Sequence, residues 1–340
     1  MLGLPPLPRT VTAALRDAEH PEARVRLSAL GDLVRHAQAD ERERVTLALI
    51  ALLRSDSQAE VRAEAAVALA DAEASGARTP LLAALEDPSL RVRQMALLAL
   101  GELGEPGDSE LGERLEGALA APEPALRFQA LVACERLMPE RAESLVATAL
   151  DDPDAEVRAM ALRLARKRWA VREAPPKLVD AARRTLSDSA SMVRASAALW
   201  LAPSGDVQAA EVLVGAITGA VPLEPGGDLE EAIEIAGELR LEAARGGLAR
   251  RAFGWLHRRS PLAWHARVAL ARLGDERARQ TILRGLHAWT RDARTLAVVA
   301  AGRAGLREAG ARIRAFVGDS RRAEPEAVAE ALALLDADTD

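Results

Sequence analysis

The sequence of 340 residues contains very few aromatic residues. It has no tyrosine, and aromatic residues make up only 2% of the chain. Strands favour aromatic and β-branched side chains, so this composition gives little support to a β-sheet. Apolar residues still reach 49%, mainly as alanine, leucine and valine, and such side chains suit closely packed helices. The composition therefore favours an all-α fold.

Cysteine and long apolar runs are scarce as well. The single cysteine, Cys134, cannot form a disulfide within the chain, and its apolar surroundings predict a buried thiol rather than a nucleophile. No stretch of about 18 apolar residues offers a membrane span. Residues 1–10 lack the basic region and apolar run that are typical of a secretory signal. These absences predict a cytoplasmic protein in a reducing compartment.

The motifs of common catalytic and cofactor sites are missing. The chain has no G-x-x-x-x-G-K-[ST] or G-x-G-x-x-G loop, no C-x-x-C and no H-E-x-x-H. His257 and His265 lie eight residues apart with no cysteine nearby, which argues against a metal site. We therefore expect no cofactor, no metal and no catalytic residues.

The chain does contain an internal repeat, and its clearest copy is DPSLRVRQMALLALGELG, from Asp87 to Gly104. Asp87 is predicted to cap a helix, and Pro88 fits the first turn of that helix. Gly101 and Gly104 are predicted to end the helix with positive φ angles. The unit therefore reads as a turn, one helix and a glycine stop.

Six copies align on an apolar residue, the arginine after it and an alanine three residues later. The arginine column consists of Arg26, Arg62, Arg93, Arg127, Arg158 and Arg194. The apolar positions before these arginines are separated by 36, 31, 34, 31 and 36 residues. A period near 34 predicts a solenoid of stacked helical hairpins.

Aspartates precede four of these arginines by six residues, in the turn before the helix. They are Asp56, Asp87, Asp152 and Asp188. Because a guanidinium group can bridge two acceptors, stacked repeats are expected to form a ladder of Asp–Arg pairs. The alternative, that these arginines grip phosphate, is weaker because they recur in every regular repeat.

The pattern D-P-x-x-x-[VL]-R-x-x-A-x-x-A-L resembles HEAT repeats, especially the short HEAT-like version of bilin lyases and many bacterial proteins. The resemblance is strong from residue 9 to about residue 203. It implies a bacterial protein with an all-α fold, an α-solenoid in the form of a right-handed superhelix of about ten hairpins. Tetratricopeptide repeats have a similar period, but their tryptophan–leucine–glycine–tyrosine pattern is missing.

Two parts of one solenoid are predicted from the regularity of the repeat. Residues 1–220 hold the regular repeats, and residues 221–340 hold divergent, arginine- and tryptophan-rich repeats that continue the same solenoid. VPLEPGGD, at 221–228, reads as an inter-helix turn or as a hinge. Outer helices are predicted at about 9–17, 40–54, 79–86, 109–120, 140–150 and 176–186.

Charge is distributed unevenly along the chain. From Arg240 to Arg322 there are 19 arginines and six acids, a net charge of +13, and three of the five tryptophans lie in the same stretch. Arginines and flat aromatic rings suit an anionic partner. The candidates are Arg251, Trp255, His257, Arg258, Arg259, Trp264, His265, Arg267 and Trp289. The plainer interpretation is that these arginines are solvated helix faces and that the tryptophans fill gaps in irregular packing.

A second candidate surface is apolar. Met95, Met160, Leu164 and Trp200 fall opposite the core stripe of their helices, at stacked positions of successive repeats. On the concave side they would form an apolar strip for a partner helix or peptide. Alternatively, they contact the outer helix of the next repeat.

Several functions follow from these features. The leading hypothesis is a non-enzymatic scaffold or adaptor that binds a protein or peptide on the concave surface of the solenoid. The second is a nucleic-acid-binding protein that uses the basic C-terminal third and resembles HEAT-like alkylpurine DNA glycosylases. Bilin lyase activity stays an alternative through the repeat that this family shares. A weaker hypothesis is attachment to an anionic membrane surface through the basic patch.

Overall fold

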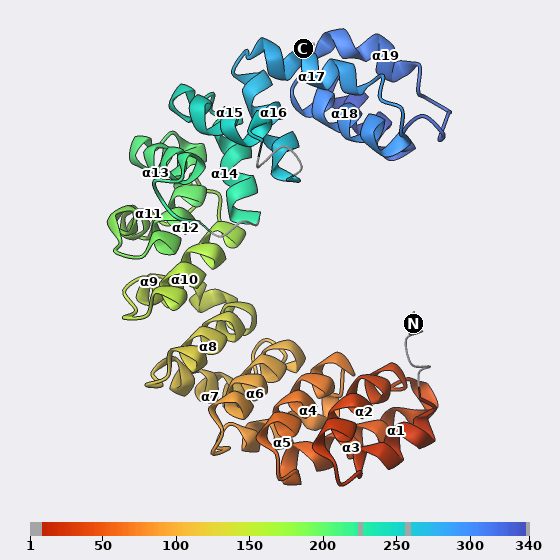
Figure 1. Cartoon of the computed structure of the whole chain (residues 1–340). Coiled ribbons are helices and arrows are strands. Elements are labelled where there is room, and N and C mark those ends of the chain that lie inside the picture. The colour runs from red at the N-terminus through yellow and green to blue at the C-terminus, as the bar shows by residue number, and fades with distance from the viewer. Residues whose placement is uncertain (1–8, 224–226, 256–259, 338–340) are drawn as a thin grey trace. The chain divides into compact units, whose positions relative to one another are not determined.

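A computed structural model describes residues 9–223, 227–255 and 260–337 (Figure 1). Within these ranges the chain forms twenty α-helices, α1 to α20, and no strand. None of the described helices is both long enough and apolar enough to cross a membrane. The all-α class and the α-solenoid of helical hairpins that the sequence predicted are confirmed.

The chain forms two compact units, Met1–Leu164 and Ala165–Asp340, called here the N-terminal and C-terminal units. The first contains α1 (Val11–Ala18), α2 (Ala23–Arg35), α3 (Arg42–Ser55), α4 (Ala59–Asp71), α5 (Arg78–Ala84), α6 (Leu90–Leu103), α7 (Ser109–Leu119), α8 (Pro124–Leu137), α9 (Ala142–Ala149) and most of α10 (Ala155–Arg168). The second contains α11 (Pro176–Arg184), α12 (Ser191–Leu201), α13 (Val207–Thr218), α14 (Gly227–Glu238), α15 (Arg245–Phe253), α16 (Leu262–Arg272), α17 (Glu276–Gly285), α18 (Arg291–Arg303), α19 (Gly310–Arg314) and α20 (Pro325–Ala337).

Odd-numbered helices pair with the even-numbered helix that follows them, as α1 with α2, α3 with α4 and α15 with α16. The even-numbered helices also pack on one another, as α2 on α4, α4 on α6 and α18 on α20, and we call them the inner helices. The six outer helices that the sequence predicted agree with α1, α3, α5, α7, α9 and α11 to within two residues at each end. The predicted change of repeat character at residue 220 concerns sequence pattern, and it does not coincide with the division after Leu164.

The hairpins share a hydrogen-bonding geometry, which Arg62 of the arginine column illustrates. Its Nη1 donates to the carbonyl oxygen of Asp56, in the turn before its own helix, at 2.8 Å. Its Nε and Nη2 donate to the two carboxylate oxygens of Asp87, in the next such turn, at 2.8 and 2.9 Å. Both side chains are nearly buried, with 13% and 12% exposed. One guanidinium group therefore ties two successive turns together.

The same geometry recurs along the column. Arg26 pairs with Asp56 and Arg127 pairs with Asp152, each through two hydrogen bonds. Arg93 pairs instead with Glu123, because alanine occupies the aspartate position of that turn. All six arginines donate to a carbonyl oxygen of their own turn, as Arg158 does to Asp152 and Arg194 does to Asp188.

The structure of α6 differs from the predicted unit in its N-cap residue and in the role of its glycines. Ser89, not Asp87, is the N-cap residue, and Asp87 instead accepts a hydrogen bond from the backbone N–H of Ser89 at 2.8 Å. The glycines do not end the helix with positive φ. Gly104 has a φ of −66°, and Gly101 lies inside α6, where a Cβ would stand 3.0 Å from the Cβ of Ala133 in α8. Close packing of inner helices, not chain reversal, therefore explains Gly101.

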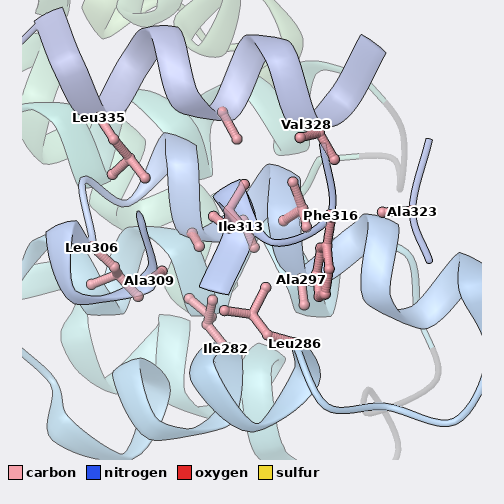
Figure 2. Close-up of a cluster of buried hydrophobic side chains, with 14 residues drawn as sticks. Ile282, Leu286, Ala297, Leu306, Ala309, Ile313, Phe316, Ala323, Val328 and Leu335 are labelled. Atoms are coloured by element: carbon pink, nitrogen blue, oxygen red, sulfur yellow. The ribbon is translucent and has the colours of Figure 1, made fainter. Parts of the chain in front are cut away.

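The core follows the alanine column. Its members, Ala29, Ala65, Ala96, Ala130, Ala161 and Ala197, have no exposed surface. Cys134 is also buried, and burial raises the pKa of its thiol to about 12. At the end of the C-terminal unit, α17 to α20 enclose a larger apolar cluster around Phe316 and Ile313 (Figure 2). The buried alanines thus allow neighbouring inner helices to lie close together, and Phe316, Ile313 and Leu335 contribute to the core of the terminal hairpins.

Glycines recur where inner helices approach most closely in the C-terminal unit. A Cβ on Gly237 would lie 2.7 Å from the Cα of Ala269, and one on Gly302 would lie 2.7 Å from the Cα of Ala331. Backbone atoms cannot move aside cheaply, so these positions fix the separation of α14 from α16 and of α18 from α20.

Replacement of one arginine of the ladder tests its contribution to stability. In Arg127→Ala the carboxylate of Asp152, with only 10% of its side chain exposed, loses its partner. We expect the free energy of unfolding to fall by about 2–3 kcal/mol, measured by urea denaturation. The control is Arg114→Ala, which breaks an exposed pair with Glu86 and should cost less than about 0.5 kcal/mol. Equal losses in both variants would contradict a structural ladder.

The ladder also predicts how stability depends on pH. Hydrogen bonds from Arg62 hold the pKa of Asp87 below its ordinary value of 3.8, although burial raises it. A lowered folded-state pKa stabilises the fold above the unfolded-state pKa, and this contribution is lost as pH falls through the folded-state value. Asp87→Asn should therefore be clearly less stable than wild type at pH 7, and the difference should shrink below about pH 4. Asp71→Asn, which removes an exposed carboxylate of the same unit, is the control; a difference independent of pH would count against the pair.

Gly302→Ala tests the close packing of α18 and α20. The added methyl group meets the backbone of Ala331, so we expect a loss of about 1–3 kcal/mol in unfolding free energy. Gly31→Ala in α2 is the matched control, because no atom lies within 4 Å of its added methyl group. The control should gain about 0.5–1 kcal/mol from reduced backbone freedom. A stabilising Gly302→Ala would show that the two helices can separate freely.

Candidate functional site

The nine residues predicted to meet an anionic partner do not act as one group. His257, Arg258 and Arg259 lie outside the described residues. Arg251 donates to the carbonyl oxygens of Ile217 and Ala216, at the C-terminal end of α13. Arg267 donates to the carbonyl oxygen of Ala252, at the C-terminal end of α15, and lies over the ring of Trp264 at 4.8 Å. Burial lowers the pKa of both guanidinium groups.

Other arginines of the basic stretch also bind helix ends. Arg250 donates to the carbonyl oxygen of Thr218, Arg245 to that of Leu273, and Arg272 to that of Arg303. The last carbonyl groups of a helix have no partner within the helix, and they carry the negative end of its dipole. Five arginines of this stretch, Arg245, Arg250, Arg251, Arg267 and Arg272, are therefore used to bind neighbouring parts of the fold.

The remaining members of that predicted group divide between core, acidic surroundings and solvent. Trp264 is half-buried and packs on the apolar cluster of the terminal hairpins. His265 lies between two carboxylates, Nδ1 at 3.1 Å from Glu234 and Nε2 at 3.3 Å from Glu230, which is no setting for an anion. Trp255 and Trp289 are 78% and 97% exposed.

The predicted apolar strip is not an open surface. Leu164 and Trp200 are buried, with 6% and 3% exposed, and the Nε1 of Trp200 donates to the carbonyl oxygen of Trp169. Only Met95 and Met160 keep part of their surface exposed. Leu164 and Trp200 therefore offer almost no surface to a partner.

An apolar groove lies instead on the inner helices of the C-terminal unit. Its cavity has a volume of about 340 Å³ and is bounded by α14, α16, α18 and α20. Its lining residues are Glu234, Glu238, Trp264, His265, Val268, Ala269, Arg272, Leu296, Val299, Ala300, Arg303, Glu330 and Leu334. We call this feature the inner groove. Leu296 and Leu334 are 49% and 41% exposed in it, so an apolar surface faces solvent there.

Charged groups border this apolar surface, and Glu234 connects several of them. Its Oε1 accepts from Arg303 Nη1 at 3.0 Å and faces His265 Nδ1 at 3.1 Å. Arg272 pairs with Glu238 at 3.2 Å, and Glu330 adds an exposed carboxylate. The lining thus holds three carboxylates, two guanidinium groups and one imidazole, so it is not a basic surface.

Glu230, Glu234 and His265 form the one cluster of metal-ligand side chains found in the described part of the chain. Their ligand atoms lie within 4.8 Å of one another, and the two glutamates lie four residues apart on α14. Carboxylate and imidazole ligands could hold a divalent cation there. Arg303 already occupies the shared oxygen of Glu234, however, and each ring nitrogen of His265 already faces a carboxylate. Ion pairing within the cluster accounts for its geometry.

A sequence signal for the inner groove is the helical position directly before the buried alanine, read on from the regular repeats into the divergent ones. Met95 directly precedes the buried alanine of its helix, and His265, Leu296 and Glu330 directly precede the buried Ala266, Ala297 and Ala331. The predicted apolar strip included only residues of the regular repeats. The signal continued into the divergent ones, where the same helical position carries mixed side chains.

Comparisons with known proteins agree with this fold. Residues 46–135 match the family model of HEAT repeats. The crystal structure of YibA from Escherichia coli is similar with a TM-score of 0.53 and 17% identity, over 78% of this chain and 93% of that chain. Kap121p bound to Pho4p gives a TM-score of 0.52 and 14% identity, over 96% of this chain and 41% of that one.

A third structure concerns the bilin-lyase resemblance. The complex of CpcE and CpcF of phycocyanin lyase from a Nostoc species has 19% identity, covers 73% of this chain and 95% of that chain, and reaches a TM-score of only 0.43. No curated protein sequence matches the chain. At these identities the structural likenesses show the fold alone. Residues 46–135 therefore match HEAT repeats, and the likeness to YibA supports a fold of stacked helical hairpins for most of the chain.

Proposed function

We propose that the protein is a non-enzymatic scaffold that binds a segment of another protein in the inner groove of its C-terminal unit. The observation that carries this proposal is the exposed apolar surface of Leu296 and Leu334 inside a cavity of about 340 Å³. Exposed apolar surface in a concave site is typical of ligand and peptide recognition. The volume suits one or two side chains of a partner rather than a large cofactor.

The chemistry of the groove narrows the kind of segment that it can hold. Val268, Val299 and the two leucines offer an apolar floor. The carboxylates of Glu234, Glu238 and Glu330 outnumber the guanidinium groups around it. A segment with an apolar side chain next to a basic one would therefore fit better than an acidic segment, because like charges oppose binding.

The state of the single cysteine, Cys134, supports binding without catalysis. The thiol of Cys134 is buried, and its raised pKa keeps it protonated at neutral pH. A protonated, inaccessible thiol is a poor nucleophile. The nucleic-acid alternative loses support because many arginines of the basic stretch donate to backbone carbonyl groups instead of standing free.

Selection of peptides from a displayed library against the purified chain tests the proposal. We expect selected peptides to carry an apolar residue beside lysine or arginine. Leu296→Glu or Leu334→Glu should then weaken their binding at least about tenfold in fluorescence polarisation, because a carboxylate replaces apolar contact surface. Leu47→Glu is the matched control, since Leu47 is 60% exposed on α3 of the other unit.

Two outcomes would contradict the proposal. One is binding that Leu296→Glu leaves unchanged while Leu47→Glu abolishes it. The other is a chain that selects no peptide but binds duplex DNA with an affinity that falls steeply as salt is raised. The second outcome would favour the nucleic-acid alternative. Circular dichroism would show whether each variant keeps its helical content.

A further inference from the structure

Three large apolar side chains stand exposed on turns of the C-terminal unit. Trp255 follows α15 and is 78% exposed, Trp289 follows α17 and is 97% exposed, and Val317 follows α19 and is 63% exposed. Each lies between an outer helix and the inner helix after it. We call them the tip residues. A tryptophan with almost its whole surface in water contributes little to the fold, and its apolar area is available to a partner.

The three turns lie on the same edge of the unit. Nε and Nη2 of Arg294, which follows Trp289, donate to the carbonyl oxygens of Arg322 and Arg321 at 2.7 and 3.0 Å. These two carbonyls belong to the turn that carries Val317, so the second and third turns are in contact.

The start of α16, which follows Trp255 in the sequence, lies beside the turn that carries Trp289. Trp264 is the third residue of α16, and its ring lies 3.3 Å from where a Cβ of Gly285, the last residue of α17, would be. The start of α16 is therefore next to the end of α17. Neighbouring hairpins are about 10 Å apart, so the three tips span about 20 Å along one edge.

The sequence of this edge differs from that of the regular repeats. Trp289 lies five residues before Arg294, just as Pro88 lies five residues before Arg93 in a regular repeat. The residue before Trp289 is Ala288, where regular turns carry the aspartate of the ladder. Arg294 still binds the carbonyl oxygens of Ala288 and Trp289, so the turn keeps its fold without the carboxylate. The indole ring is therefore not needed to form the turn.

We propose that this edge docks on the surface of an anionic lipid bilayer, with the two indole rings in the headgroup region. Tryptophan prefers that region because its ring is apolar and its N–H is polar. Separate convex tips suit a fluid surface, whereas a protein or peptide partner would need a groove of defined shape.

The charge of the edge fits a bilayer better than a nucleic acid. The second and third turns, together with the first residues of the helices that follow them (residues 286–296 and 315–325), hold four arginines and three acids. They are Arg291, Arg294, Arg321 and Arg322, with Asp292, Asp319 and Glu324. The sequence of the first turn adds Arg258 and Arg259, which lie outside the described residues, so the net charge of the three segments is +3. A nucleic acid requires that several phosphates be neutralised, but Arg291 and Arg322 already pair with Glu324 and Asp319, and Arg294 donates to backbone carbonyl groups. A small positive charge beside exposed indole rings is enough to favour anionic headgroups.

Co-sedimentation with vesicles tests the proposal on the full chain. Vesicles of equimolar phosphatidylcholine and phosphatidylglycerol should bind the wild type more strongly than vesicles of phosphatidylcholine alone. The double variant Trp255→Ala, Trp289→Ala should bind at least about fivefold less, because it removes both interfacial anchors. Lipids brominated near the headgroup should quench part of the wild-type tryptophan fluorescence and none of the signal of the double variant.

Leu47→Ala is the matched control, because it shortens an exposed apolar side chain of the other unit. Leu334→Glu, in the inner groove and outside the edge, should leave vesicle binding unchanged, so this test is independent of the proposed peptide binding. The proposal is overturned if the wild type does not sediment with the anionic vesicles, or if the double variant binds as well as wild type. Duplex DNA that binds in a Trp289-dependent manner and displaces the vesicles would assign the edge to nucleic acid instead.

Discussion

The hydrogen bonds of a buried arginine with two successive turns are the interaction on which the regular hairpins depend. Arg62 satisfies a carbonyl oxygen of its own turn and both carboxylate oxygens of Asp87 in the next turn. A planar guanidinium group with five donors can do both at once, and an ammonium group cannot. The contact joins neighbouring hairpins, because the carboxylate of each such turn accepts from the arginine of the preceding hairpin, as that of Asp87 does from Arg62.

In the C-terminal unit several arginines stabilise the fold by donating to backbone carbonyl groups and not to carboxylates. Arg251, Arg267 and Arg294 donate to backbone carbonyl groups at the ends of neighbouring helices or in neighbouring turns. These three guanidinium groups are thereby occupied by contacts within the fold. This leaves an inner face whose chemistry is mixed and partly apolar, which is why the basic composition of this stretch does not translate into a basic groove.

The inner groove and the tip residues both lie where the repeat departs from its pattern. His265, Leu296 and Glu330, which line the groove, each precede a buried alanine, and Trp289 stands where the regular turn has Pro88. The alanine column and the glycines Gly237 and Gly302 keep the helices in place while these positions vary. The proposed binding surfaces and the positions that hold the helices together are thus different positions of the same hairpins.

The sequence by itself determined the helical hairpins, the buried alanine column and the pairing of arginine with turn aspartates, because each follows from a short pattern repeated at a fixed interval. Only the tertiary structure decided the role of Gly101, which accommodates Ala133, and the surroundings of His265, which faces two glutamates of another helix. It likewise decided that Trp200 is buried and Trp289 exposed. These outcomes depend on contacts between helices about 30 or more residues apart, whose side chains no local period describes.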